Sequence, residues 1–260
     1  MSSYGICQLT LIPVRKDPAE RSEMTTQLLF GETFEILEKQ SPWSYIKCHF
    51  DDYKGWVTSG MITPISADSL NTHQDTKKVY LKEPVCRVLS SESKLPVTYL
   101  AGGSTLLLKD DNQIIFGDNI LNLEQNAALH YPNSAIDIIS TCMKFLNTPY
   151  LWGGRTIFGI DCSGFTQIVF KMNGIVIPRD AHQQAEIGKT INNIEDAKPG
   201  DLAFFNREDG KIIHAGIILE DMKIIQSLGK VHIARIDQQG IYYGQPKNYI
   251  HNLRIIKRIL

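Results

Sequence analysis

The feature that most limits how this chain can fold is a change in the spacing of its apolar residues. Up to residue 128, apolar and polar residues mostly alternate in short segments, which are separated by turns rich in Gly, Pro and Asp. Alternation with a period of two is typical of half-buried strands. From residue 134 to residue 172 the spacing is helical, and apolar strand-like segments follow it. The sequence therefore predicts a β-rich first half and a mixed second half.

The β-rich half divides into two parts. We expect residues 1–65 to form a small closed β-barrel, because short alternating segments are broken at "FGE", "QSPW" and "DDYKG". Residues 66–128 repeat this pattern faintly and predict a second barrel. The segments "FGETFEILEKQ" and "AGGSTLLLKDD" could be matching parts of the two barrels.

Residues 129–260 are expected to form an α+β domain. The segment "SAIDIISTCMKFLN" predicts one helix, and a second helix should begin near Cys162, with Phe165 and Ile168 on one apolar face. The segments "DLAFFN", "KIIHAGIIL", "KIIQSLG", "VHIARID" and "NLRIIKRIL" then predict strands, and the short turns between them favour antiparallel neighbours. Helices followed by an antiparallel sheet define the α+β class.

Composition narrows the choice of partners and compartment. The chain has 27 Lys and Arg against 28 Asp and Glu, so neither nucleic acid nor an anionic membrane is expected as a partner. We find neither a run of eighteen apolar residues nor a signal peptide pattern. The five cysteines form no CxxC pair, which favours reduced thiols and a cytoplasmic location. A periplasmic or secreted location remains open if a leader has been removed, and a monomer is expected.

Cys162 is the candidate nucleophile. It follows Asp161, a helix-capping residue type, and stands at the predicted start of a helix, where unpaired N–H groups and the helix dipole favour a thiolate. We therefore expect the pKa of Cys162 to be lowered. The alternative is that Cys162 is an ordinary buried cysteine between helix and sheet.

His214 is the candidate base, because it interrupts an apolar strand-like segment. If residues 220 and 221 form the turn after this strand, paired positions sum to about 441, and Gln226 falls opposite residue 214 or 215. Gln226 could then orient the imidazole. His232 is the alternative orienting residue, one strand further away. A zinc site formed by Cys162, His214 and His232 lacks a close ligand pair, so no metal is expected.

Five segments in order resemble the NlpC/p60 family of bacterial cysteine peptidases, which have a papain-like catalytic core: "TPYLWGGRTIFGIDCSGF", "IPRDAHQQAEIG", "AKPGDLAFF", "HAGIIL" and "IIQS". The resemblance implies that Cys162 is the nucleophile and His214 the base. It places Gln226 at the third polar position, which is more often His in the family. It also implies that Tyr150 donates to the oxyanion together with the Cys162 N–H.

The segments "IPVRKDPAERSEMTTQLLFGETFEIL", "WSYIKC" and "DDYKGWV" resemble the bacterial SH3-like domain of one subgroup of this family. That subgroup has two SH3-like barrels before the peptidase domain and cleaves γ-D-glutamyl–diamino acid bonds in cell-wall peptides that begin with a free L-Ala. Its substrate-binding residues correspond here to Glu23, Tyr53, Ser163, Arg179 and Asp180. Where family members often have Ser after that Asp, this chain has Ala181, so one hydrogen bond is in doubt.

The resemblance predicts a cysteine endopeptidase that needs no cofactor and acts on small muropeptides, L-Ala-γ-D-Glu followed by diaminopimelate or Lys. A free ammonium is costly to bury without a carboxylate, and Asp180 and Glu23 could supply that charge. In the alternative interpretation, Asp180 pairs with Arg179 or a surface lysine, and Glu23 is merely solvated. Two other functions stay open: a non-catalytic protein that binds cell-wall peptides, and an amidase or acyltransferase on the same fold.

Overall fold

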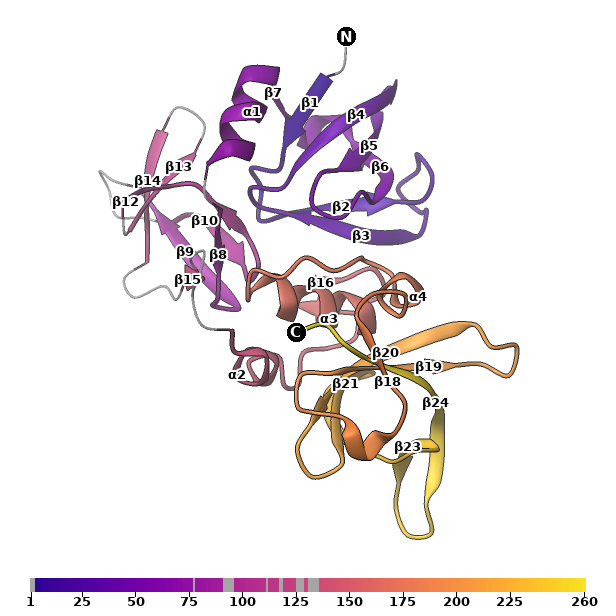
Figure 1. Cartoon of the computed structure of the whole chain (residues 1–260). Helices are drawn as coiled ribbons and strands as arrows, with labels where there is room; N and C mark the ends of the chain where they lie inside the picture. The colour runs from indigo at the N-terminus through magenta and orange to yellow at the C-terminus, as the bar shows by residue number, and fades with distance from the viewer. Residues whose placement is uncertain are drawn as a thin grey trace. The chain divides into compact units, whose positions relative to one another are not determined.

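The computed structural model describes residues 3–76, 78–90, 96–110, 112–116, 119–124, 129–130 and 136–260 (Figure 1). The chain divides into two compact units. The first contains Met1–Ile136 and Lys171–Val176, and the second contains Asp137–Phe170 and Ile177–Leu260. In the described part of the chain, no helix has the length and apolar character needed to cross a bilayer.

The first unit begins with one antiparallel sheet of seven strands in the order β3-β2-β6-β5-β4-β1-β7, which bends around an apolar core (Figure 1). The core includes Phe34, Ile46 and Val57, which alternate with polar residues along β4, β5 and β6 as the sequence predicts. The strands are β1 (Ser3–Ile6), β2 (Leu11–Arg15), β3 (Met24–Leu29), β4 (Thr33–Gln40), β5 (Trp43–Cys48), β6 (Lys54–Thr58) and β7 (Thr63–Ile65), with a 3-10 turn η1 (Ser59–Met61) between the last two.

The sequence did not predict the helix α1 (Ala67–Asp75), which follows at once and whose N-cap is Ser66. It is short and polar, and only Leu70 and His73 are buried. The remaining strands of this unit form a five-stranded sheet, β10-β9-β14-β13-β12, and a three-stranded sheet, β11-β8-β15. They are β8 (Val79–Leu81), β9 (Val85–Leu89), β10 (Pro96–Ala101), β11 (Thr105–Leu106), β12 (Leu108–Asp110), β13 (Gln113–Phe116), β14 (Asn119–Leu123) and β15 (Leu129–His130). The predicted domain boundary at residue 128 lies outside the described residues.

The two segments that looked like a sequence repeat form the same turn. Gly31 and Gly103 both have a left-handed backbone, with φ of 79° and 81°. In both turns, the N–H of the residue after the glycine donates to the carbonyl three residues earlier. Glu32 donates to Leu29 and Ser104 donates to Ala101, each at 3.0 Å. A glycine is favoured there because other residues rarely adopt positive φ.

The second unit contains the helical part of the chain. The helix α2 (Ile138–Met143) is shorter than predicted and begins after Asp137, whose side chain accepts from the Ser140 N–H. Residues 134 and 135 of the predicted helix lie outside the described residues. A short hairpin of β16 (Arg155–Thr156) and β17 (Gly159–Ile160) precedes α3 (Cys162–Lys171), and α4 (Ala181–Gln184) follows it. The helix α3 is buried on all sides and not on one face only, since Thr166 and Gln167 are as inaccessible as Phe165 and Ile168.

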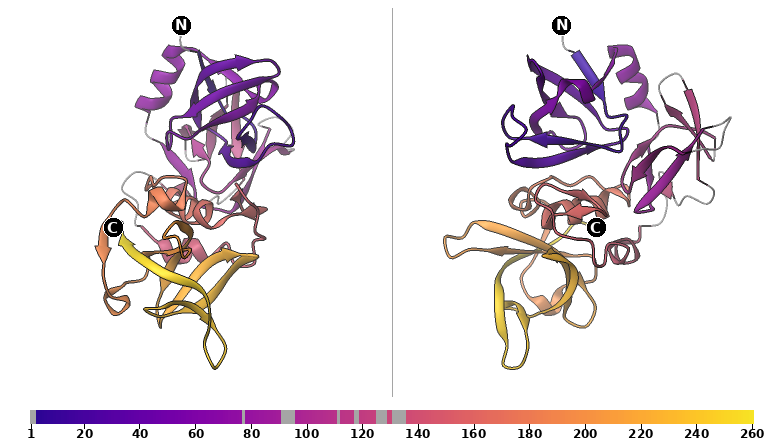
Figure 2. Two further views of the ribbon diagram at one scale, coloured as in Figure 1. Left: turned by 90° about the vertical axis from the view of Figure 1, so that its right-hand side faces the viewer. Right: turned by 180° about the vertical axis from the view of Figure 1, so that it is seen from behind.

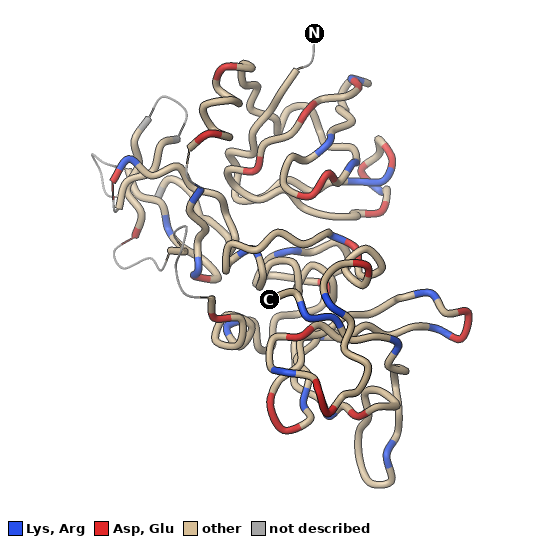
Figure 3. Tube along the Cα trace, viewed as in Figure 1, with Lys and Arg blue, Asp and Glu red and all other residues tan. Residues whose placement is uncertain are grey.

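The rest of the second unit is an antiparallel sheet that closes on itself. Its order is β18-β24-β19-β20-β21-β22-β23, and an additional pairing of β23 with β24 completes a barrel (Figure 2). Its strands are β18 (Lys189–Ile191), β19 (Leu202–Asn206), β20 (Ile212–Leu219), β21 (Lys223–Leu228), β22 (Lys230–Ile236), β23 (Gly240–Tyr243) and β24 (Asn248–Arg258), with a 3-10 turn η2 (Ile194–Asp196) after β18. Basic and acidic residues are interspersed along both units (Figure 3).

Candidate active site

Asp161 fixes the start of α3. Its Oδ1 accepts from the Gly164 N–H at 2.6 Å, which confirms the predicted helix cap, and its Oδ2 accepts from the Gly153 N–H at 2.8 Å. Arg179 donates to both carboxylate oxygens, at 3.0 and 2.6 Å, and to the Ser163 hydroxyl at 2.9 Å. These contacts tie the glycine turn, the helix terminus and the segment before α4 into one buried cluster.

Cys162 is the first residue of α3 and is almost completely buried. Burial raises the pKa of its thiol to about 12, and the nearby Asp161 carboxylate adds to this shift. The N–H groups of Ala215 and Ser163 act in the opposite direction but do not offset the loss of water. The expected lowering of the Cys162 pKa is therefore wrong. The helix terminus supplies donors, but in the free protein the sulfur carries its proton.

The sulfur of Cys162 contacts the main chain of β20 at the N–H of Ala215, the residue that follows the proposed base His214. His214 is itself buried, and burial together with the neighbouring His251 lowers its pKa to about 3. The imidazole is therefore neutral at ordinary pH. A neutral imidazole beside a protonated thiol can accept the proton as the sulfur attacks.

Gln226 holds the imidazole. Its Oε1 lies 2.5 Å from Nε2 of His214. Since a carbonyl oxygen only accepts, Nε2 must carry the proton, and the lone pair then lies on Nδ1. The predicted partner is confirmed, but the predicted strand register is wrong by one residue.

The turn between β20 and β21 contains three residues, 220–222, and not two, so paired positions sum to 442 and Gly216 lies opposite Gln226. Asp221 and Met222 both have positive φ in this turn. His214 is the diagonal neighbour of Gln226, and a long side chain still reaches it.

Tyr150 also lies near the sulfur. Burial, and after it the neighbouring Cys162 and Asp161, raise the pKa of Tyr150 to about 12, so its hydroxyl keeps its proton and remains a donor. Its backbone N–H donates to the Gly229 carbonyl at 2.9 Å, which ties this segment to the turn between β21 and β22. The geometry is compatible with the predicted donor to an oxyanion, a role that stays a prediction.

The predicted substrate-binding residues belong to different parts of the chain. Ser163 and Arg179 lie in the buried cluster around Asp161, with which Arg179 forms an ion pair. Asp180 begins α4, where its N–H donates to the Gln183 side chain at 3.3 Å. Glu23 and Tyr53 lie in the first unit, where Glu23 is exposed and 3.8 Å from the Lys16 ammonium. Substrate binding by these residues stays a prediction.

Sequence reasoning missed three side chains around the base. The ring of His251 on β24 stacks on His214, with centroids 4.6 Å apart and planes 19° apart, and Phe205 on β19 lies 5.8 Å from His214. Tyr243 on β23 interacts with Gln226. The strand β23, which carries Tyr243, was not predicted, and the pairing of β19 with β24, which carry Phe205 and His251, could not be inferred from a local turn. Among the described residues, no three His, Cys, Asp or Glu side chains are grouped so as to hold a metal ion.

Known proteins share this sequence and fold. A sequence model of the NlpC/P60 family matches residues 147–251, and a model of the bacterial dipeptidyl-peptidase SH3 domain matches residues 14–61. A γ-D-glutamyl-L-lysine dipeptidyl-peptidase of Bacillus subtilis is 32% identical over 218 residues, which are 78% of this chain and 71% of that protein. The chain belongs to the NlpC/P60 family of cysteine peptidases.

A further relative is similar in sequence, and a solved structure is similar in fold. A dipeptidyl-peptidase of the same name from Bacillus cereus is 28% identical over 79% of this chain and 68% of its own length. The crystal structure of an NlpC/P60 family protein from Bacillus cereus has the same fold, with a TM-score of 0.83 at 21% identity over 99% of this chain and all of that one. The family, the papain-like fold with an N-terminal SH3-like domain, and the cysteine peptidase class that the sequence predicted are confirmed.

Proposed function

We propose that this chain hydrolyses the γ-D-glutamyl–diamino acid bond of cell-wall peptides, with Cys162 as nucleophile and His214 as base. One observation carries the assignment of residues: the Cys162 sulfur lies at the main chain next to His214, whose Nε2 is held by Gln226. The substrate class rests on the relatives named γ-D-glutamyl-L-lysine dipeptidyl-peptidase.

The reaction starts from the neutral pair. As the sulfur of Cys162 attacks the γ-glutamyl carbonyl, its proton passes to Nδ1 of His214, and the imidazolium that forms is held through Nε2–H by the Gln226 oxygen. The carbonyl oxygen, on which negative charge develops, accepts hydrogen bonds from the Cys162 N–H at the start of α3 and from the Tyr150 hydroxyl. His214 then returns the proton to the leaving amine, and water hydrolyses the thioester.

The alternative of a peptide-binding protein without activity lacks a specific observation in its favour. A buried thiol, a neutral imidazole and an orienting amide have no role in binding alone. An amidase or acyltransferase would use the same catalytic residues and differ only in substrate.

Hydrolysis of L-Ala-γ-D-Glu-L-Lys tests the proposal. The wild type should release L-Ala-D-Glu and L-Lys, and Cys162→Ala should be inactive while it still binds the peptide. The same peptide with an acetylated N-terminus should be cleaved much more slowly, and Glu23→Gln or Asp180→Asn should reduce this preference. If the wild type binds the peptide without turnover, the enzymatic assignment to this substrate is wrong. If it cleaves both peptides equally, the requirement for a free ammonium is wrong.

A further inference from the structure

The amide of Gln226 can face His214 in two ways, and only one of them leaves a base. With its oxygen towards His214, Nε2 of the imidazole carries the proton and Nδ1 can accept one from Cys162. With its NH₂ group towards His214, Nε2 would have to accept, and the proton would move to Nδ1. The protein therefore needs something that fixes the orientation of this amide.

His232 provides the first fixed point. Its Nδ1 lies 2.8 Å from the Lys230 carbonyl oxygen, and its Nε2 lies 2.5 Å from the Tyr243 hydroxyl. A carbonyl oxygen only accepts, so Nδ1 carries a proton, and in the tautomer with its single proton on Nδ1 the nitrogen Nε2 accepts. The Tyr243 hydroxyl must then donate to His232.

Tyr243 connects His232 to Gln226 and presents a hydrogen-bond acceptor to it. Because its proton is used by His232, its hydroxyl oxygen offers lone pairs to other neighbours. Gln226 lies directly opposite His232 in the pairing of β21 with β22, and its side chain interacts with the Tyr243 hydroxyl. The amide nitrogen of Gln226 is buried and has no hydrogen-bond partner among the described residues. An acceptor that faces this amide favours its NH₂ side, since a buried donor without a partner is costly.

We propose that His232 and Tyr243 are positioning residues, which fix the orientation of the Gln226 amide and thereby the tautomer of His214. Hydrogen bonds lead from the Lys230 carbonyl through His232 to Tyr243, and the interaction of Tyr243 with Gln226 then decides which nitrogen of the base is free. The proposal rests on the proposed role of His214 as the base. From the sequence, Gln226 and His232 were alternative residues for orienting the base. In the proposal both take part: Gln226 contacts His214, and His232 acts on Gln226 through Tyr243.

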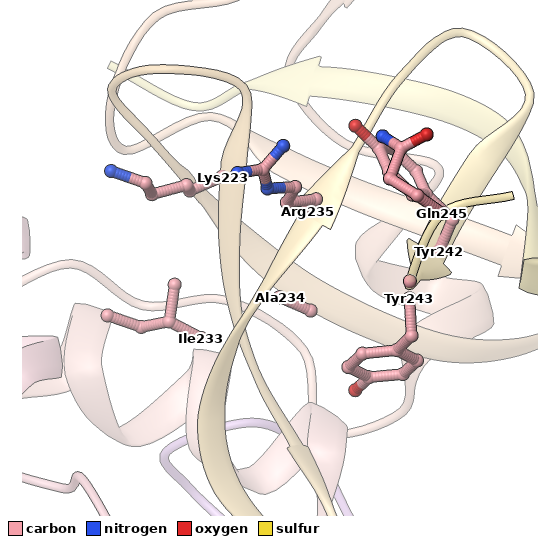
Figure 4. Close-up of a pocket in the computed structure, with 8 residues that line it drawn as sticks. Lys223, Ile233, Ala234, Arg235, Tyr242, Tyr243 and Gln245 are labelled. Atoms are coloured by element: carbon pink, nitrogen blue, oxygen red, sulfur yellow. The ribbon is translucent and has the colours of Figure 1, made fainter. Parts of the chain in front are cut away.

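The position of Tyr243 makes the proposal testable. It lines a cavity of about 490 Å³ formed by residues of β21, β22 and β23 and the turn after β23. Its ring points away from Arg235 and Gln245, which also line this cavity (Figure 4). The side chain is 39% exposed, so Tyr243→Phe removes the hydroxyl without opening a space in the core. Tyr242→Phe is the matched control, because it removes a hydroxyl from the neighbouring residue on the same strand.

The first measurement is kinetic. Tyr243→Phe and His232→Leu should each lower kcat about 3- to 10-fold with little change in KM, which is the factor that one hydrogen bond can contribute. Because both act through the same amide, the double variant should be no slower than Tyr243→Phe alone. In a Gln226→Glu background, Tyr243→Phe should have no further effect, since a carboxylate accepts on both sides. An additive double variant, or an undiminished effect in the Gln226→Glu background, would overturn the proposal.

The second measurement is spectroscopic and does not depend on activity. In protein labelled with ¹⁵N at histidine, the ring nitrogens of His214 should show Nε2–H in the wild type and in Tyr242→Phe, and a mixture of both tautomers in Tyr243→Phe. An unchanged tautomer in Tyr243→Phe contradicts the proposal. If Cys162→Ala or Gln226→Ala keeps full activity, the catalytic assignment fails instead, and the two failures are therefore distinguishable.

Discussion

Replacement of Arg179 by Met is expected to destabilise the second unit strongly. Arg179 is 1% exposed, and its guanidinium donates to both oxygens of the Asp161 carboxylate and to the Ser163 hydroxyl. Methionine fills much of the space but leaves the carboxylate buried without its cation. Removal of one partner of a buried ion pair costs about 3–5 kcal/mol. For a unit of this size, that corresponds to a fall in Tm of roughly 10–20 °C.

Calorimetry of the whole chain measures this effect, and an exposed pair provides the control. Arg87 binds Glu124 in the first unit with both side chains largely in water, so Arg87→Met should change Tm little. The combination of Arg179→Met with Asp161→Asn should recover part of the loss, because it removes the unpaired charge and keeps an acceptor for the Gly164 N–H. The reasoning is refuted if Arg179→Met shifts Tm no more than Arg87→Met, or if the double variant is less stable than Arg179→Met alone.

Three other predictions concern the catalytic pair. Because the pKa of Cys162 is raised to about 12, the rate of its alkylation by iodoacetamide should rise roughly tenfold per pH unit from pH 6 to 9. An alkylation rate that does not depend on pH would indicate a preformed thiolate and contradict this. Gln226→Ala should lower kcat by about 10²-fold, the order of one general-base contribution, and far more than His232→Ala; the reverse order would remove Gln226 as the orienting residue. His251→Phe keeps a stacked ring but removes the charge that, after burial, lowers the pKa of His214. The pKa of His214 should therefore rise, and activity should be lost at a higher pH on acidification. An acid limb of the kcat/KM profile that stays at the wild-type pH contradicts this.

The sequence predicted the parts of the site that depend on neighbouring segments. Asp161 and Cys162 could be placed because a helix start has a local signature. Gln226 could be placed opposite the base because β20 and β21 are joined by a short turn. An error of one residue in that turn did little harm, since the glutamine side chain is long enough to reach a diagonal neighbour.

The parts that depend on the whole domain could not be predicted. His251 reaches the base through the pairing of β24 with β19, which lies beside β20, and Tyr243 reaches Gln226 through the strand β23, which pairs with β22 and β24. These pairings join segments that are far apart in the sequence. The pKa of Cys162 was predicted in the wrong direction for the same reason. The position at a helix terminus can be inferred from the sequence, but the burial that outweighs it depends on the packing of the whole unit.

The most direct test of the catalytic account is a search for its covalent intermediate. Protein mixed with L-Ala-γ-D-Glu-L-Lys and quenched in acid within milliseconds should gain the mass of the L-Ala-D-Glu acyl group, and peptide mapping should locate that group on Cys162. The adduct should be absent from Cys162→Ala, which should also release no L-Lys. Turnover of the peptide without an adduct, or with an adduct on another residue, would contradict the assignment of Cys162 as the nucleophile.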